Sequence, residues 1–145
     1  QAVVSNLDEN DVVIKSAAVA DYKPKTYSDN KIKKKDGDLV IELDRNKDIA
    51  YEIGKIKNDK ILVGFAAETN DIIENAKAKI AKKNMDFIVA NNLKESGAGF
   101  GTDTNIVSII EKDGSMKEYP MMTKEEVASV ILDKIKTLLD NKSSL

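Results

Sequence analysis

The sequence predicts an α/β domain of three layers, in which helices cover both faces of a mostly parallel sheet. Two observations predict this fold class. Apolar segments of strand length alternate with amphipathic segments of helix length, as in parallel strands joined by crossover helices. Three of the apolar segments end in small residues followed by polar ones, as strands do where a ligand approaches the backbone. The 145 residues suffice for one core, so we expect residues 1–145 to form a single domain.

The first strand is expected over residues 12–17, which begin with the β-branched run Val12-Val-Ile. The polar stretch that follows contains Asp36-Gly37, a strong signal for a hairpin between residues 31–35 and 39–43. Leu39, Ile41 and Leu43 recur at every second position of this segment, which predicts one half-buried face. We therefore expect residues 21–43 to leave the sheet as a mobile, lysine-rich loop and hairpin.

The rest of the chain alternates between helices and strands. Asn46 suits a helix N-cap, and Asp48 complements the positive end of the helix that would follow. A capping box at 123–126 predicts the start of the last helix. The other expected elements are strands at 61–65, 85–90 and 105–110, a hairpin from the last of these to 116–119, and a helix from about 70 to 83.

The composition excludes several kinds of chemistry. The chain has no cysteine and no histidine, so it supplies no thiol nucleophile, no imidazole base and no His/Cys zinc site. A metal ion would be a hard one held by oxygen, such as Mg²⁺ or Mn²⁺. The net charge of −2 argues against a nucleic-acid partner, and no apolar run could span a bilayer. The lack of cysteine fits a cytoplasmic location.

Polar residues follow three of the predicted strands, at 17–21, 66–68 and 90–92. Because the carboxyl ends of parallel strands share one edge of a sheet, we expect these segments to lie close together. The alanines in them are explained more simply by packing against helices. Asp21 comes after the apolar segment of the first predicted strand and begins the lysine-rich loop. This position favours a role for Asp21 in binding a ligand or a metal.

Several lysines have both a structural and a functional interpretation. Lys31 and the lysines after it could form a solvated face, or Lys31 could close over a phosphate. Lys79 lies at the edge of the apolar stripe of its helix, and Lys83 lies inside that stripe. Their stems could pack while the ammonium groups reach water, or the pair could contact a bound phosphate. Pattern alone slightly favours packing.

Five segments in order carry a family resemblance: 17–24, 31–34, 63–69, 88–91 and 98–101. Together they resemble phosphopantothenate–cysteine ligase, which is commonly the C-terminal domain of a bifunctional coenzyme A biosynthesis flavoprotein. The resemblance covers residues 12–139 and implies a Rossmann-like, ribokinase-like fold. It also implies that an opening strand and a glycine-rich segment belong before Gln1. We therefore expect a truncated ligase domain that is incomplete for catalysis.

The resemblance implies a function in coenzyme A biosynthesis. The family uses CTP to join 4′-phosphopantothenate to L-cysteine through an acyl-cytidylate intermediate. The resemblance therefore implies CTP as co-substrate and Mg²⁺ or Mn²⁺ as cofactor. It implies FMN only if a decarboxylase domain lies upstream. It also implies a cytoplasmic homodimer, in which residues 31–43 are the candidate dimer contact. Positioned lysines and a metal would stabilise the charge, so the chemistry needs no histidine or cysteine.

Carried over by motif, the resemblance assigns Lys31 as the catalytic lysine and Asp21 as the residue that serves the metal. It assigns nucleotide binding to Lys15, Ser16, Ala17, Asp21, Lys31, Asn46, Lys47, Asp48, Ile49, Phe65, Lys79 and Lys83. For Lys79 and Lys83 it favours ligand contact over packing. Lys47 stands where the family usually has proline, a change that should be tolerated because proline only presets the first helical turn.

Two other functions remain open on the sequence alone. A dinucleotide-dependent dehydrogenase would need a Gly-x-Gly-x-x-Gly turn between a strand and a helix, and the glycines at 97–101 do not lead into a helix. A non-catalytic nucleotide- or RNA-binding module could use the lysine loop. That loop has few aromatic residues on which bases could stack.

Overall fold

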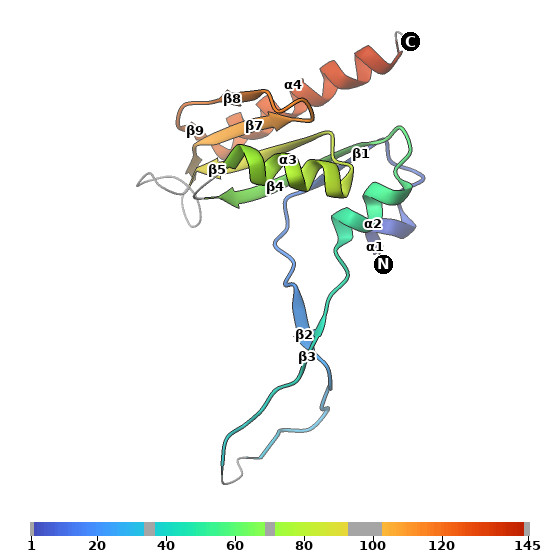
Figure 1. Cartoon of the computed structure of the whole chain (residues 1–145), viewed down its shortest axis with the longest axis vertical. Coiled ribbons are helices and arrows are strands. Elements are labelled where there is room, and N and C mark those ends of the chain that lie inside the picture. Colours follow the sequence, from blue (N-terminus) through green and yellow to red (C-terminus); the bar gives the residue numbers. More distant parts are fainter. Residues whose placement is uncertain (1, 34–36, 69–71, 93–102, 144–145) are drawn as a thin grey trace.

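The computed structural model describes residues 2–33, 37–68, 72–92 and 103–143, which fold around a five-stranded sheet (Figure 1). Its strands are, in spatial order, β1 (Val12–Lys15), β4 (Ile61–Glu68), β5 (Phe87–Asn92), β7 (Val107–Glu111) and β8 (Met116–Glu118). The pairs β1–β4 and β4–β5 are parallel, and β7 is antiparallel to both β5 and β8. Only β7 therefore runs against the others, which confirms the mostly parallel sheet.

Helices cover both faces of this sheet. α2 (Ile49–Ile56) and α3 (Ile72–Lys83) pack on one face, and α4 (Lys124–Ser143) packs on the other. The alternation of β4 explains the arrangement, because Leu62 and Ala66 belong to the first core and Ile61 and Val63 to the second. The three-layer prediction is confirmed. None of the helices described is long and apolar enough to cross a membrane.

The remaining elements are short. α1 (Ala2–Ser5) precedes β1, and β6 (Thr104–Asn105) pairs with β9 (Met122–Thr123) beside the start of α4. The predicted capping box at this start is confirmed, because the Thr123 N–H donates to Glu126 at 2.7 Å and the Glu126 N–H donates back to the Thr123 hydroxyl at 3.2 Å. The predicted elements of the sheet and helices are present, with ends that differ by up to three residues, the largest difference being at the end of β4.

A long arm leaves the domain between β1 and α2 (Figure 1). Among its described residues, strand pairing is confined to the root, where β2 (Tyr22–Pro24) lies antiparallel to β3 (Leu43–Arg45). The Arg45 guanidinium donates to the Tyr22 hydroxyl at 3.1 Å and lies 5.6 Å from the centre of the Tyr22 ring. Hydrogen bonding and a cation–π contact thus join the two sides of the arm at its root.

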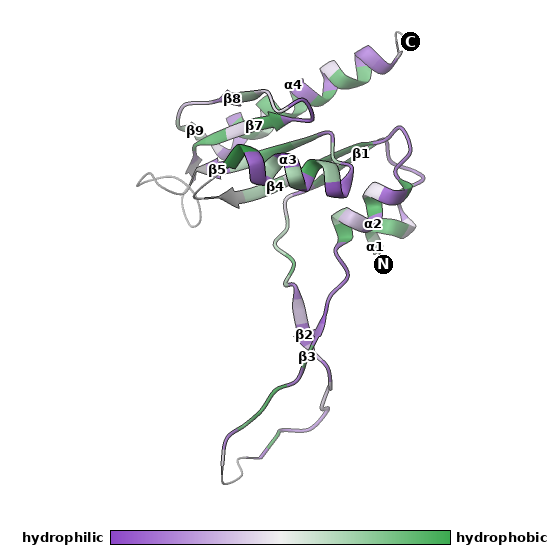
Figure 2. Ribbon diagram, in the orientation of Figure 1, coloured by the Kyte–Doolittle hydropathy of each residue, from purple (hydrophilic) through white to green (hydrophobic). Residues whose placement is uncertain are grey.

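The hairpin predicted within the arm is wrong in two respects. Residues 31–33 and 37–42 form no strand, because the pairing lies closer to the domain. The predicted half-buried face is also wrong, since Leu39, Ile41 and Leu43 are 72%, 62% and 55% exposed. Figure 2 shows this apolar stretch away from the rest of the domain, so its alternation has no surface against which to pack. Gly37 has the positive φ of a turn, 102°, while the other turn residue lies outside the described residues.

A buried ion pair ties the end of α2 to the sheet. Lys57 is 3% exposed, and its ammonium donates to Asp86 at 2.9 Å and to the Lys60 carbonyl at 2.7 Å. Asp86 also accepts from the Leu62 N–H at 2.7 Å, and the Lys112 ammonium lies 3.4 Å away. Burial acts to raise the pKa of Asp86, but these donors and positive charges outweigh it and lower the pKa.

Replacing Asp86 by Asn should lower the free energy of unfolding by about 3 kcal/mol, because it leaves the Lys57 ammonium buried without a counter-ion. The folded pKa of Asp86 lies below its unfolded value, so its stabilisation is complete above roughly pH 4 and is lost as the pH falls through the folded pKa. Urea unfolding from pH 7 to pH 3 should show the difference between wild type and variant shrinking at the acid end.

The control is Glu52→Gln, which removes an exposed ion pair with Lys55 on the same helix. It should change stability by less than about 1 kcal/mol. Equal losses in the two variants would show that the buried pair contributes no more than an exposed one.

Candidate functional site

The parallel pairing brings the carboxyl ends of β1, β4 and β5 to one side of the sheet. Lys15, the last residue of β1, pairs with Gly64, and Glu68 at the end of β4 pairs with Asn92 at the end of β5. This confirms the expectation that the polar segments after these strands lie on a common side. Two hollows open near these ends, one on each face of the sheet.

The first hollow is a polar cleft where the chain leaves β1, which we call the lysine cleft. It is bounded by the start of α2 and the end of α3, and it is lined by Lys15, Val19, Ala20, Asp21, Asn46, Lys47, Asp48, Ile49 and Lys83. Seven of these nine are among the residues for which the motifs predict nucleotide binding. The structure therefore brings Asp21 and Lys83 to the same cleft, although they are far apart in the sequence.

The charges of the lysine cleft favour an anion. Its three lysines and two aspartates give a net charge of +1. The Lys83 ammonium lies 2.8 Å from Asp48, which also accepts from the Tyr51 N–H at 3.2 Å. Partial burial acts to raise the pKa of Asp48, but the contacts with Lys83 and Tyr51 and the charge of Lys15 outweigh it and lower the pKa. Asp48 thus stays ionised at neutral pH.

Asn46 joins the two sides of the cleft. Its N–H donates to the Asp21 carbonyl at 2.7 Å, and its side-chain amide donates to the Ala20 carbonyl at 2.8 Å. The prediction that Asn46 is the N-cap of the helix is wrong, because Asp48 caps α2. The amide of Asn46 is used instead to hold the chain after β1 against the chain before α2.

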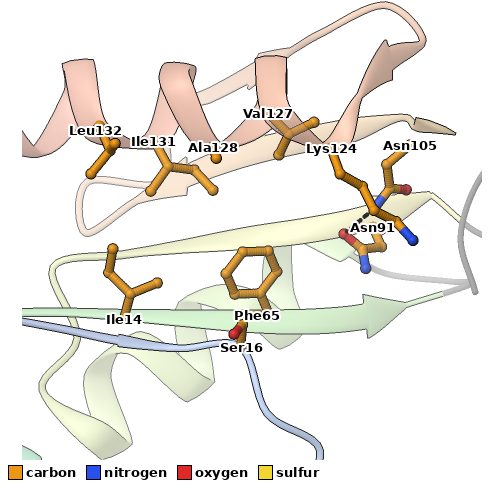
Figure 3. Close-up of a pocket in the computed structure, with 10 residues that line it drawn as sticks. All are labelled: Ile14, Ser16, Phe65, Asn91, Asn105, Lys124, Val127, Ala128, Ile131 and Leu132. Carbon is orange, nitrogen blue, oxygen red and sulfur yellow. Dashed lines mark hydrogen bonds between the residues drawn. The ribbon is translucent and has the colours of Figure 1, made fainter. Parts of the chain in front are cut away.

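The second hollow is a groove of about 660 Å³ between the sheet and α4 (Figure 3). Ser16 and Phe65 line this groove and not the lysine cleft. Figure 3 shows Phe65 facing the apolar side chains of α4, with the polar end of the groove formed by Asn91, Asn105 and Lys124. Asn105 donates to the Asn91 side chain at 3.2 Å. The motifs assigned Asn91 no role, although it lies within one of the three polar segments, 90–92.

The two hollows differ in size as well as polarity. The lysine cleft has a volume of about 80 Å³, well below the roughly 300 Å³ or more of pockets that enclose a ligand. It can therefore hold a phosphate or one edge of a base, while the rest of a nucleotide would lie outside it. The groove is larger but mainly apolar along its length, so its size does not make it the better anion site.

Three predicted residues line neither hollow. Ala17 follows Ser16, and its carbonyl accepts from the Lys15 ammonium at 3.4 Å. Lys79 is partly exposed on α3, and Lys31 is exposed on the arm. The glycine-bearing loop at 93–102 lies outside the described residues, as do Lys34 and Lys35.

The metal prediction depends on Asp21 alone. The described residues contain no group of three or more acidic side chains that could hold an ion by themselves. Protein-bound Mg²⁺ usually has one or two carboxylate ligands and otherwise water and substrate phosphates. A single carboxylate in a cleft suited to phosphate therefore fits an ion that binds together with a nucleotide.

Comparison with known proteins gives several similar relatives. The chain is 54% identical over 138 residues to "Coenzyme A biosynthesis bifunctional protein CoaBC" of Bacillus subtilis (strain 168), covering 95% of this chain and 34% of that protein. It is 49% identical over 140 residues to "Cysteine/Cysteine sulfinic acid decarboxylase" of an unknown prokaryotic organism, covering 96% of this chain and 39% of that protein. The chain thus spans little more than a third of these curated relatives.

A solved structure is also similar. It is described as the crystal structure of the C-terminal domain of coenzyme A biosynthesis bifunctional protein CoaBC, with a TM-score of 0.76 and 44% identity over 97% of this chain and 62% of that chain. Residues 1–139 match the family described as "DNA/pantothenate metabolism flavoprotein C-terminal domain". These findings confirm the family identified from the five motifs: the chain belongs to the DNA/pantothenate metabolism flavoprotein C-terminal domain family, of which the ligase part of CoaBC is a member.

Proposed function

We propose that this chain provides the nucleotide site of a phosphopantothenate–cysteine ligase, a cytoplasmic enzyme of coenzyme A biosynthesis. The observation that carries the proposal is the lysine cleft, in which seven residues assigned by family motifs come together from four separate parts of the chain. The coenzyme A function in the names of a relative and of a solved structure supports it. The decarboxylase named in the other relative need not lie in the 39% that this chain matches.

The reaction proceeds in two steps. The carboxylate of 4′-phosphopantothenate attacks the α-phosphorus of CTP, a P–O bond forms, and pyrophosphate leaves to give the acyl-cytidylate. The amine of L-cysteine then attacks the acyl carbon, the amide bond forms, and CMP leaves. Both steps need orientation of the reactants and stabilisation of phosphate charge, and neither needs a protein nucleophile. A chain without cysteine or histidine can therefore support them.

Residues of the lysine cleft divide these tasks. Lys15 and Lys83 neutralise the phosphates. The N–H groups at the start of α2, beside Lys47 and Ile49, have no acceptor within the helix and receive an anion or the polar edge of the base. Asp21 would hold the Mg²⁺ or Mn²⁺ ion, whose charge offsets that of the phosphates. Phe65 and Ser16 border the part of the nucleotide that lies beyond the cleft. FMN would belong to a decarboxylase domain, if one accompanies this chain.

Lys31, the proposed catalytic lysine, lies on the arm. It lies outside both hollows, so it reaches a nucleotide only when the arm moves or when a second copy presents it. The arm also carries exposed apolar residues, of which Val40 is 82% and Ile41 62% exposed. Such a patch is typical of a protein interface. We therefore propose a homodimer formed through the arm, in which the partner covers these side chains.

Calorimetric titration of the chain should detect weak binding of CTP with Mg²⁺ and none of NAD. Lys83→Gln should weaken CTP binding by about tenfold, because a hydrogen bond to a charged group contributes roughly 1.5 kcal/mol or more. The control is Lys82→Gln, an exposed neighbour on α3 outside the cleft, which should change the affinity less than about twofold. Salt-sensitive RNA binding without any response to CTP would instead support the RNA-binding alternative.

In the complete ligase, Lys31→Gln should mainly lower kcat, by about a hundredfold, with little change in KM for CTP. The reason is that a lysine which contacts the phosphates only after closure stabilises the transition state more than the bound substrate. Steady-state kinetics with CTP and cysteine as varied substrates measure both constants. Lys33→Gln, two residues along the same exposed segment, is the control and should keep the wild-type rate; a wild-type rate for Lys31→Gln would end its assignment.

Size-exclusion chromatography with light scattering should give twice the 16.0 kDa mass of one chain. The double change Leu39→Ser and Ile41→Ser should shift the mass to that of a monomer, because it removes exposed apolar area from the arm. Leu132→Ser on α4 removes a side chain of similar exposure, 57%, and should leave the dimer intact. A single-chain mass for the wild type at high concentration would refute a dimer of this chain.

A further inference from the structure

The position of Lys83 depends on contacts between α2 and α3 to which the proposed function assigns no role. Lys83 is the last residue of α3, and its ammonium reaches Asp48 at the start of α2. Its side chain is 23% exposed, so most of its stem is covered. A lysine at a helix end is ordinarily free to turn among several rotamers, whereas this one is held at both ends of its side chain.

Gly54 fixes the backbone of Lys83. A Cβ atom at this position would overlap the Lys83 carbonyl oxygen, so only glycine allows the end of α3 to lie directly on α2. Gly54 is itself buried within α2. Glycine is unfavourable inside a helix by roughly 1 kcal/mol relative to alanine, and the close approach gives a physical reason for its presence here.

Asn84 holds the same junction from the other side. Its side-chain amide donates to the Gly54 carbonyl at 3.0 Å, and its backbone has a φ of 48°, which ends α3. Asn tolerates this left-handed conformation better than most residues. One residue therefore both stops the helix directly after Lys83 and joins that end to α2.

We propose that Asp48, Gly54 and Asn84 are positioning residues that hold the Lys83 ammonium in the lysine cleft, ready to donate to a phosphate of a nucleoside triphosphate. An ammonium has three hydrogens, and among the described residues only Asp48 accepts one of them from Lys83. The other two can point to a ligand. Because the side chain is already ordered, binding loses less conformational freedom. The inference deepens the proposed function and rests on it.

The test uses Asn84→Gly in the full 145-residue chain, because glycine keeps the positive φ but removes the hydrogen bond to Gly54. The matched control is Asn58→Gly. Asn58 has the same conformation, φ 49°, just after α2, and makes no side-chain hydrogen bond to the residues that the structure describes. Asn84→Gly should weaken CTP–Mg²⁺ binding by about fivefold, and Asn58→Gly by less than twofold.

Asp48→Asn is the second variant, and it remains informative should Asn84→Gly fail to fold. Asparagine is as good an N-cap as aspartate, so the change removes the ion pair and keeps the cap. If Asp48 acted only through its negative charge, removing it would tighten the binding of an anion. The positioning role predicts weaker binding, by about fivefold as well.

A second readout does not depend on the nucleotide. NMR of the lysine side chains in the free protein should show a slowly exchanging, restrained Lys83 ammonium, which becomes as mobile as that of Lys82 in Asn84→Gly and Asp48→Asn. An equally restrained Lys83 in both variants, or unchanged or tighter CTP binding in them, would overturn the inference while leaving the nucleotide site standing. A wild type that does not bind CTP would overturn both.

Discussion

The two hydrogen bonds that Asn46 donates to Ala20 and Asp21 are the constraint on which the candidate site depends. About 25 residues of arm separate the donor from its acceptors, and the pairing of β2 with β3 is only three residues long. Without these bonds, the segment after β1 and the segment before α2 would not be held together to line the cleft. Asp21 would then be attached to one mobile segment and Asp48 to another, and the lysine cleft would have no defined shape.

Helix α2 has one Lys–Asp pair near each end, and the two pairs differ in their exposure to solvent. The Lys57–Asp86 pair is largely buried, and Lys57 donates two hydrogen bonds while Asp86 accepts two, which suits a permanent structural tie. Asp48 and Lys83 are partly open to solvent, which leaves room for a ligand beside them. A short helix of eight residues thus fixes the sheet at one end and presents a charged group at the other.

The features that depend on local periodicity could be predicted from the sequence. The predictions failed where a tertiary contact determines the role or the burial of a residue. Strands and helices of the domain followed from apolar spacing, and the Thr123 cap followed from a four-residue motif. Asn46 was mistaken for a cap because a tertiary contact uses its amide, and the apolar alternation of the arm did not reveal that nothing in the described chain covers it. The pairing of Lys83 with Asp48, 35 positions away, has no local signal. Family motifs found both residues but did not predict that they meet.

The two edges of the sheet differ in their protection. β8 is a strand of three residues whose exposed side chains include Lys117 and Glu118, and short charged strands of this kind resist pairing with foreign chains. β1, at the opposite edge, has the sequence Val-Val-Ile-Lys and leaves Ile14 40% exposed. Of these two edges of the described sheet, β1 is therefore the more open to pairing with another chain, and a charged residue in place of Ile14 would act there as a gatekeeper against aggregation.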